Sequence, residues 1–242
     1  MKITIGWLHE YLNKSKNLDL VDSMTSIGLE VESSKKYRKE SVIDIDITPN
    51  RPDCLSVYGI ARDLSAKHNL RLIPIKTSKL EVKNSSNLIS KIDHKIAPVY
   101  SALILTNFNN KIKTPASIAN KLRACGISRI NFIVDLINYV MIEIGQPMHA
   151  FDVDKLSGKI NIRNSKQGET ISCLDGKSYE LTINTPVIAD TSGPVAIAGV
   201  IGGQSTAVDI NTKSILIESA YFLPDCVRLS SKNHRIQTDS SH

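Results

Sequence analysis

His149 is the first residue whose type and setting could support chemistry. It lies in IEIGQPMHAFD (142–152), directly after a Gly-Gln-Pro bend and between two apolar residues. A histidine there is either a core residue satisfied by a backbone group or a group that moves a proton or orients water, since its pKa lies near neutrality. Taken alone, the segment favours the core interpretation, because a single histidine is a weak signal.

Glu218 interrupts the apolar run ILIESAYF. A buried carboxylate without a partner costs several kcal/mol, on the order of the penalties known for buried charge. Glu218 must therefore lie at the surface, form an ion pair or contact a ligand. In a strand, alternation would put its side chain on the same face as Leu216 and Ala220.

Other polar or flexible segments leave a similar choice open. Asn138, in the apolar run DLINYV, either braces the backbone or binds a ligand. The glycine-rich run AIAGVIGGQ (196–204) either packs tightly or lets a ligand approach the backbone, and its spacing fits neither a Walker nor a Rossmann loop. Thr238 either caps a helix or hydrogen-bonds a substrate hydroxyl. A basic group near the end either faces solvent or meets phosphates: Arg228, Lys232, His234 and Arg235.

Composition sets broad limits on these choices. The chain has 242 residues, of which 41% are apolar, so one large or two modest domains with aliphatic cores are expected. The net charge of +6 suits a polyanion such as RNA, or serves solubility. The four cysteines have no CxxC or zinc spacing, so we expect reduced thiols in a cytoplasmic protein and no metal site. The sequence contains neither a signal-peptide core nor an apolar run of membrane-spanning length.

Periodicity and turn residues predict the elements that must position these groups. One helix is expected to begin at Asp19 or Asp22 and to end at Gly28. Further helices are predicted at 54–70, 115–127 and 224–237. Strands are predicted at 42–53, 99–108, 159–165, 186–203 and 214–222. The apolar segment 130–149 fits either helix or strand, and SSKKYRKES (33–41) is expected to be a polar connector.

These elements predict an α+β protein with two domains. A polar, Ser/Asn/Lys-rich stretch marks a boundary near 77–85. We therefore expect a small N-terminal α+β domain at 1–78, followed by a mixed-sheet domain at 85–242.

Seven strings occur along the chain in one order: MTSIGLEVE, ITPNRPDCLSVYGIARDL, KLRACGI, VDLINYVMIEIGQPMHAFD, AIAGVIGGQ, ILIESAYF and TDSSH. From about residue 5 to 242, this series resembles the N-terminal part of the bacterial phenylalanyl-tRNA synthetase beta chains. The resemblance implies that 1–78 is that family's N-terminal domain. The OB-fold RNA-binding module that interrupts this domain in most members is absent, because LEVESSKKYRKES runs directly into VIDIDITPNRPD. It also implies that 85–242 is an editing domain, which hydrolyses tyrosine wrongly attached to the phenylalanine tRNA.

The resemblance also implies roles for particular residues. Glu218 would bind the tyrosine hydroxyl, and Ala198 and Gly199 would line the amino-acid pocket. His149 and Asn138 would hold the ester end and the attacking water. Thr238 would complete the wall of the pocket. Ser240 stands where the family usually has alanine, and its added hydroxyl could narrow the pocket or change its selectivity.

The same resemblance implies partners and cofactors. Editing itself needs neither a cofactor nor a metal, whereas the whole enzyme uses ATP and Mg²⁺ through its alpha chain. The expected partners are the phenylalanine tRNA and the alpha chain, in an alpha2-beta2 heterotetramer. No membrane partner is expected.

Two observations qualify this expectation. The chain ends at His242, before the Arg-Phe-Glu-Arg-Gly stretch of the family, so we expect an incomplete editing domain with an unpaired sheet edge. Ser240 and the missing module also leave room for a non-catalytic tRNA-binding or structural module with a decayed pocket. A free-standing trans-editing deacylase is the other alternative, although the N-terminal domain argues against it.

Overall fold

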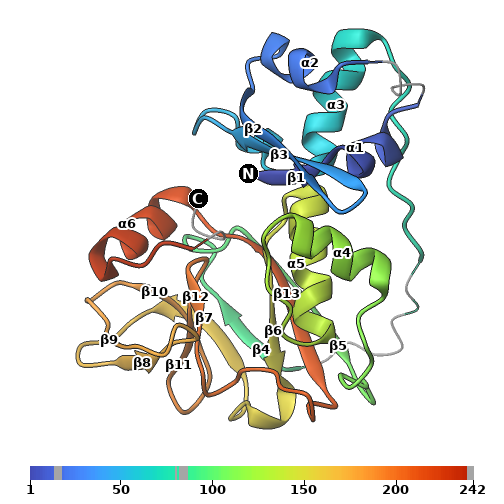
Figure 1. The fold of residues 1–242 in the computed structure, drawn as a ribbon. Coiled ribbons are helices and arrows are strands. Elements are labelled where there is room, and N and C mark those ends of the chain that lie inside the picture. The colour runs from blue at the N-terminus through green and yellow to red at the C-terminus, as the bar shows by residue number, and fades with distance from the viewer. Residues whose placement is uncertain (14–17, 80, 82–86, 239–242) are drawn as a thin grey trace. The chain divides into compact units, whose positions relative to one another are not determined.

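The computed structural model describes residues 1–13, 18–79, 81 and 87–238. These residues form two compact units (Figure 1). The first unit comprises 1–81 and 112–146, and the second comprises 82–111 and 147–242. Among the described residues, the first unit has one sheet and the second has three, each unit has its own core, and the chain passes between the units three times.

The first unit combines a small antiparallel sheet with helices. The strands are β1 (Lys2–Thr4), β2 (Glu30–Tyr37) and β3 (Glu40–Asp46), in the order β1-β3-β2. The helices are α1 (Ile5–Tyr11), α2 (Leu20–Ser26), the 3₁₀ turn η2 (Pro52–Cys54), α3 (Val57–His68), α4 (Ala116–Ala124) and α5 (Phe132–Ile144). The predicted ends of α2 are confirmed, since the Asp19 carboxylate caps its start and Gly28 follows its end with φ +82°.

The prediction of a polar connector at 33–41 is wrong. This stretch forms most of β2, which pairs with β3 through a tight turn that begins at Arg38 with φ 56°. β2 is an edge strand, and its side chains alternate between exposed and half-buried over much of its length. Charged and polar residues are normal on an exposed sheet edge, so a polar composition does not distinguish an edge strand from a connector. Pairing with β3 stabilises β2 as a strand.

The ambiguous segment 130–149 holds a helix followed by a strand. The Asn131 side chain accepts a hydrogen bond from the Val134 N–H at 3.1 Å, which caps the start of α5. Gly145, with φ +79°, ends the helix, and the chain continues into strand β6 (Met148–Asp152). The caps separate the two elements where apolar periodicity could not.

Helices α4 and α5 belong to the first unit, although the predicted division at 1–78 and 85–242 puts them in the second domain. Leu122 of α4 and Ile142 of α5 share a core cluster with Trp7 of α1. Tyr139 stacks on Trp7, with 4.8 Å between the ring centroids. Burial of these aliphatic and aromatic surfaces explains why 112–146 packs with the first unit. As a division by function, the two predicted ranges stay a prediction.

A hydrogen-bonded network strengthens the same packing. The carboxylate Oε1 of Glu143 accepts hydrogen bonds from the hydroxyls of Tyr11 at 2.5 Å and Tyr139 at 2.7 Å. The Lys121 ammonium lies 4.7 Å from the Trp7 ring centroid and pairs with Glu10 at 2.6 Å. These contacts join α1 to α4 and α5 through groups far apart in the sequence.

The second unit contains ten strands and one longer helix among the residues described. They are β4 (Ile89–Ile92), β5 (Val99–Leu105), β6, the 3₁₀ turn η3 (Val153–Lys155), β7 (Ile160–Asn164), β8 (Thr170–Ser172), β9 (Ser178–Glu180), β10 (Pro186–Ala189), β11 (Pro194–Ile197), β12 (Ile201–Gly202), β13 (Ile215–Tyr221) and α6 (Pro224–His234). One sheet has the order β12-β11-β10-β7-β4, another has the order β5-β13-β6, and β8 and β9 form a hairpin. Because β4 and β7 are parallel and the other pairs are antiparallel, the predicted mixed sheet is confirmed, as is the α+β fold class.

The five-stranded sheet lies between two hydrophobic clusters. Ile188, Ala196 and Ala198 pack with Phe151 and Leu216 of the three-stranded sheet. The alternate residues pack with the β8–β9 hairpin and the segment after α6: Val187, Ala189, Ile197, Ile171, Leu181 and Ile236. Burial of both faces explains why PVIADTSGPVAIAGVIGG is apolar along most of its length.

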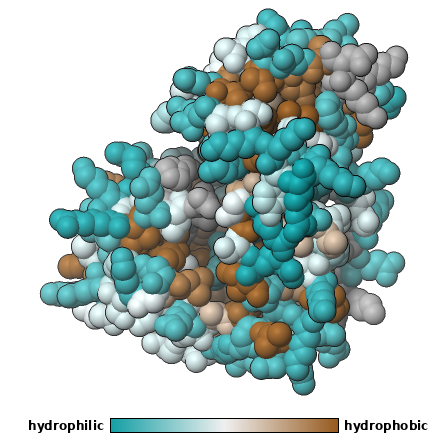
Figure 2. Space-filling model, in the orientation of Figure 1, coloured by the Kyte–Doolittle hydropathy of each residue, from teal (hydrophilic) through white to brown (hydrophobic). Residues whose placement is uncertain are grey.

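Hydrophilic side chains cover much of the face seen in Figure 2, and apolar residues emerge in small groups. Ile130 and Ile183 are among the most exposed large apolar residues, at 72% and 60%. Within the described ranges, no helix combines the length and the apolar character needed to cross a membrane.

Candidate functional site

A row of polar side chains crosses the three-stranded sheet of the second unit. Glu218 of the central strand β13 lies opposite His149 on β6 and Ala102 on β5. Tyr100 lies opposite Ala220, two residues further along β13. Since side chains alternate along a strand, Tyr100, His149 and Glu218 share one face of the sheet, and we call these three residues the polar row.

The polar row faces the hydrophobic layer between the two sheets. Leu216 and Phe151 point to the same face, and both are fully buried in the cluster shared with the five-stranded sheet. The Tyr100 ring packs against this cluster, and Glu218 is only 5% exposed. Polar groups thus lie where the strand pattern otherwise supplies apolar ones.

Each residue of the polar row has a buried polar atom without a hydrogen-bond partner among the described residues. These atoms are Glu218 Oε2, His149 Nε2 and the Tyr100 hydroxyl oxygen, and Thr206 Oγ1 is a further example in the same unit. Buried polar atoms nearly always find partners, because an unmade hydrogen bond costs about 1–3 kcal/mol. The concentration of such atoms on one sheet face is typical of a site that completes its hydrogen bonds with a ligand.

Burial sets the protonation states of the row. It raises the pKa of Glu218 to about 8 and lowers the pKa of His149 to about 4. Burial, together with the nearby Glu218 charge, also raises the pKa of Tyr100. At neutral pH the carboxyl group is therefore mostly protonated and the imidazole is neutral. A protonated carboxyl both donates and accepts hydrogen bonds, and a neutral imidazole can accept one from water.

The position of the His149 ring is fixed by close neighbours. It meets the Phe151 ring edge to face, with 4.5 Å between centroids. A Cβ atom on Gly202 of β12 would lie 2.3 Å from His149 Cε1 and 2.7 Å from Nε2. Only glycine leaves room for the imidazole at this point, so β12 and Phe151 together hold the ring.

The predicted residues of the glycine-rich run lie in the same unit as the row. The Ala198 N–H donates to the Pro186 carbonyl at 2.9 Å, and Ala198 belongs to the cluster between the sheets. Gly199 has φ +69°, and a Cβ there would lie 2.7 Å from Val227 Cγ2 of α6. The Thr238 hydroxyl donates to the Val200 carbonyl at 2.8 Å, which ties the end of the described chain to this turn.

The structure therefore brings together five of the predicted residues in one unit: His149, Ala198, Gly199, Glu218 and Thr238. Asn138 lies half-buried on α5 of the first unit, and its role stays a prediction. Ser240 lies outside the described residues. In the basic group near the end, His234 Nε2 accepts a hydrogen bond from the Thr182 N–H at 3.3 Å, so it serves packing.

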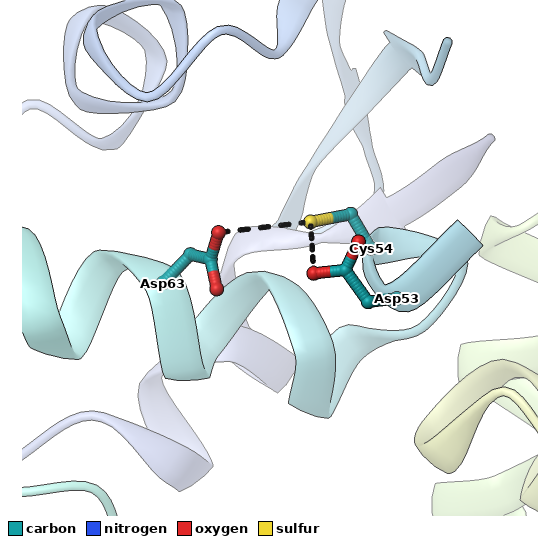
Figure 3. Close-up of side chains that lie close together, drawn as sticks. All are labelled: Asp53, Cys54 and Asp63. Carbon is teal, nitrogen blue, oxygen red and sulfur yellow. Dashed lines mark hydrogen bonds between the residues drawn. The ribbon is translucent and has the colours of Figure 1, made fainter. Parts of the chain in front are cut away.

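A second polar cluster, in the first unit, has the ligand types of a metal site. Asp53, Cys54 and Asp63 lie close together (Figure 3), with their potential ligand atoms within 4.8 Å of one another. Two arginines already pair with both carboxylates: Arg51 Nε lies 3.1 Å from Asp53, and Arg62 Nη2 lies 2.5 Å from Asp53 and 3.1 Å from Asp63. Arg51 also pairs with Asp63. We call these five residues the arginine–carboxylate cluster.

The charges in this cluster are already balanced. Hydrogen bonds from Arg51 lower the pKa of Asp53, so its charge is already compensated. Burial raises the pKa of Cys54 to about 11, so a metal would have to displace the thiol proton as well as both arginines. The cluster is best explained as an ion-pair network that holds the turn η2 against α3.

Sequence reasoning missed Tyr100 and Gly202. Tyr100 lies in the strand VYSALIL, where an aromatic residue is expected on packing grounds alone. Its hydroxyl gains meaning from the pairing of β5 with β13, which the sequence does not reveal. Gly202 belongs to the glycine-rich run, but its contact with His149 depends on tertiary packing.

Comparison with known proteins gives a consistent result. Residues 96–242 match the model of a protein family described as the B3/4 domain. The chain is 43% identical over 206 residues to the phenylalanine--tRNA ligase beta subunit of Francisella tularensis, covering 84% of this chain and 26% of that protein. It is 45% identical over 203 residues to the subunit of the same name from Aquifex aeolicus, with coverage of 84% and 26%. The resemblance found in the sequence is thereby confirmed.

The chain spans about a quarter of the length of these curated relatives, as the 26% coverage indicates. Among solved structures, it is similar to a crystal structure of an N-terminal fragment of the phenylalanyl-tRNA synthetase beta-subunit from Pyrococcus horikoshii. That similarity has a TM-score of 0.48 at 17% identity, and it covers 95% of this chain and 70% of the other.

Proposed function

Since the chain belongs to the B3/4 domain family, we propose that its second unit is an editing site that hydrolyses tyrosine wrongly esterified to the phenylalanine tRNA. The proposal draws on the relatives, which are named phenylalanine--tRNA ligase beta subunits. It draws equally on the polar row, whose chemistry suits a ligand that carries one phenolic hydroxyl.

One observation carries the proposal: Glu218 is buried and its Oε2 has no partner within the described ranges. Phenylalanine and tyrosine differ by a single hydroxyl group. A tyrosine hydroxyl would complete the hydrogen bonding of Glu218, whereas a phenylalanine ring would leave the carboxyl unpaired. Sites built on such a hydrogen bond discriminate by roughly 10⁴–10⁵.

His149 is proposed to act at the ester end of the ligand. With a pKa of about 4, its imidazole is a weak base at neutral pH. We therefore assign it the role of accepting a hydrogen bond from the attacking water and orienting it. The water oxygen attacks the ester carbonyl carbon, the bond to the ribose oxygen breaks, and the proton that the water loses passes to the ribose oxygen. The backbone at Ala198 and Gly199 is proposed as the wall beside the amino acid.

For the whole protein, the partners are proposals of the same kind. Aminoacylation would use ATP and Mg²⁺ in an alpha chain, within an alpha2-beta2 heterotetramer in the cytoplasm. The net charge of +6 suits contact with the phosphates of the phenylalanine tRNA. Hydrolysis at the polar row would require neither ATP nor a metal.

Substitution of Glu218 by Leu tests the proposal. Glu218→Leu should lower the ratio of tyrosyl-tRNA to phenylalanyl-tRNA hydrolysis roughly tenfold, because it removes a hydrogen bond between neutral groups that is worth about 0.5–1.5 kcal/mol. Hydrolysis of both esters is measured with the phenylalanine tRNA. The matched control is Glu180→Leu on the exposed strand β9, which should leave the ratio unchanged.

Two results would contradict an editing site. Hydrolysis of tyrosyl-tRNA at the rate seen in buffer would support the non-catalytic tRNA-binding module, provided that the chain still binds the tRNA. An unchanged ratio in Glu218→Leu would remove Glu218 from the recognition of tyrosine.

A further inference from the structure

Tyr100 contributes a buried hydroxyl that the proposed hydrolysis does not use. Its ring packs against the hydrophobic cluster between the two sheets, and its hydroxyl oxygen has no hydrogen-bond partner in the part of the chain that is described. Phenylalanine would fill the same space without an unpaired polar atom, so a purely structural tyrosine here is unfavourable. The hydroxyl therefore calls for a partner that binds from outside the chain.

The strand register puts Tyr100 beside Glu218. Tyr100 pairs with Ala220, and Glu218 pairs with Ala102, so the two long side chains occupy diagonal positions on one sheet face. Diagonal residues of an antiparallel pair are roughly 7–8 Å apart, within reach of aromatic and long side chains. The other two corners are the alanines Ala102 and Ala220, whose short side chains cannot reach the polar ends of Tyr100 and Glu218.

The sheet position directly opposite Glu218 is exposed. Ala102 is exposed, although Glu218 is only 5% exposed. The Glu218 carboxyl is therefore buried beside an exposed position of the same sheet face. A small aromatic ligand that enters beside Ala102 would meet both polar ends.

We infer that Tyr100 is a specificity-determining residue whose hydroxyl binds the phenolic hydroxyl of the ligand together with the Glu218 carboxyl. A phenolic hydroxyl has one hydrogen to donate and lone pairs to accept with. The ligand O–H donates to the Glu218 carboxyl, and the Tyr100 O–H donates to the ligand oxygen. Two partners on adjacent strands fix the hydroxyl in direction as well as in place. The identity of the ligand as a tyrosyl ester rests on the proposed function, but the binding of a phenol does not.

This inference predicts opposite effects of one substitution on the free and the bound chain. Tyr100→Phe removes an unpartnered polar atom from the free chain, so the free chain becomes more stable. The same change removes a hydrogen bond from the complex, so binding becomes weaker. A tyrosine that served only the core would not produce this pair of effects.

The experiment measures binding of L-tyrosinamide and L-phenylalaninamide to the 242-residue chain by NMR titration. Tyr100→Phe should reduce the preference for L-tyrosinamide about tenfold, as expected for one hydrogen bond. It should also raise Tm by about 2–4 °C. The matched control is Tyr221→Phe at the end of β13, where the side chain is 53% exposed and points to the opposite face. The control should change neither quantity.

The outcomes separate this inference from the proposed function. An unchanged preference in Tyr100→Phe, or an equal loss of affinity for both amides with a lower Tm, overturns the inference. The same holds if the unmodified chain binds both amides equally. If the chain prefers L-tyrosinamide and Tyr100→Phe weakens this preference, yet tyrosyl-tRNA is not hydrolysed, the inference stands and the proposed function fails. If tyrosyl-tRNA is hydrolysed and the preference is intact in Tyr100→Phe, the reverse holds.

Discussion

The two polar clusters of this protein differ in how completely their hydrogen bonds are made. In the arginine–carboxylate cluster, Asp53 and Asp63 each pair with two guanidinium groups. In the polar row of the second unit, Glu218, His149 and Tyr100 each keep a buried atom without a partner within the described ranges. The arginine–carboxylate cluster combines residue types that are common in metal sites. The polar row consists of three polar residues on a sheet face where the strand pattern otherwise supplies apolar ones.

The comparison shows that residue types alone mislead in both directions. Asp, Cys and Asp in close contact suggest a cation, yet the neighbouring arginines already supply the positive charge. The polar row has no group of carboxylates that would suggest a cation, yet each of its residues keeps a buried polar atom without a hydrogen-bond partner within the described ranges. Completed networks stabilise a fold, and incomplete ones indicate a binding site. If this distinction is right, changes beside the first cluster affect stability and changes beside the second affect ligand recognition.

The largest effect is expected from Gly59→Ala, beside the arginine–carboxylate cluster. A Cβ atom on Gly59 of α3 would lie 1.9 Å from the Asp53 carbonyl oxygen, which cannot move without displacing the turn η2. We expect the first unit to lose about 3 kcal/mol of unfolding free energy, at the upper end of typical overpacking costs. Trp7 is the single tryptophan and lies in this core, so its fluorescence during urea unfolding reports the loss.

Gly28→Ala is the matched control for Gly59→Ala. Gly28 has φ +82°, and a Cβ atom there would have no neighbouring atom within 4 Å. Only backbone strain of about 1–2 kcal/mol is therefore expected. Both variants should retain the preference for L-tyrosinamide. A loss of that preference in Gly59→Ala would show that the two clusters are not separate in their effects.

The next largest effect is expected from Gly202→Ala, beside the polar row. The added methyl group would overlap His149 Cε1 and displace the ring, because side chains yield more easily than backbone. Hydrolysis of tyrosyl-tRNA should fall about 100-fold, as expected for misplacement of a reacting group by about 1 Å. The urea midpoint reported by Trp7 should not change.

A double variant tests whether the Gly202→Ala effect acts through the ring. In a His149→Ala background, Gly202→Ala should cause little further loss of hydrolysis. Independent, additive losses would mean that β12 contributes to the site in another way.

The smallest effect concerns the pH dependence of stability. The pKa of Glu218 is about 8 in the folded chain, whereas its ordinary value, which applies to the unfolded chain, is 4.5. Between these pH values the carboxyl is protonated in the folded chain and ionised in the unfolded chain. Stability therefore falls as the pH rises through this range. For His149, with a folded pKa of about 4 and an ordinary value of 6.5, stability rises with pH over that interval. The two slopes oppose each other between pH 4.5 and 6.5, and the Glu218 slope remains alone from pH 6.5 to 8.

Urea unfolding followed by circular dichroism measures this slope. From pH 6.5 to 8 the unfolding free energy should fall by on the order of 1–2 kcal/mol, since the limit is about 1.4 kcal/mol per pH unit for one proton. Glu218→Gln should abolish the fall, and Glu180→Gln should leave it intact.

The arginine–carboxylate cluster should show the opposite pH dependence, since its contribution to stability is lost as the pH falls. The lowered pKa of Asp53 contributes stability that is lost as the pH falls below its ordinary value of 3.8. If the unfolding free energy of Glu218→Gln still falls above pH 6.5, the fall does not come from the buried Glu218 carboxyl.

Local signals predicted the elements well where both ends are marked. The Asp19 cap, Gly28 and the apolar runs of the second unit each specify a helix end or a strand without reference to distant residues. β2 escaped prediction because its polar residues suit an edge strand as well as a loop. The assignment of 112–146 to the first unit was also out of reach, since it depends on contacts between Trp7 and Tyr139.

The candidate site was predictable in part. The sequence reduced Glu218 to three alternatives, and its burial, without an ion pair among the described residues, supports the proposed ligand contact. Tyr100 could not be recognised, because its significance depends on the pairing of two strands that are distant in the sequence. His149 was recognised through the family resemblance rather than through its own setting.

The strand order β5-β13-β6 has a consequence for the synthesis of this protein. The N-terminus of the chain leaves the ribosome first, so β5 and β6 emerge long before β13, the strand that lies between them. Until β13 has been synthesised, neither β5 nor β6 has its partner strand. Because the paired residues are far apart in the sequence, this sheet has a high contact order. Glu218 lies on that last strand. A nascent chain therefore acquires the sheet and the proposed recognition of tyrosine in a single late step.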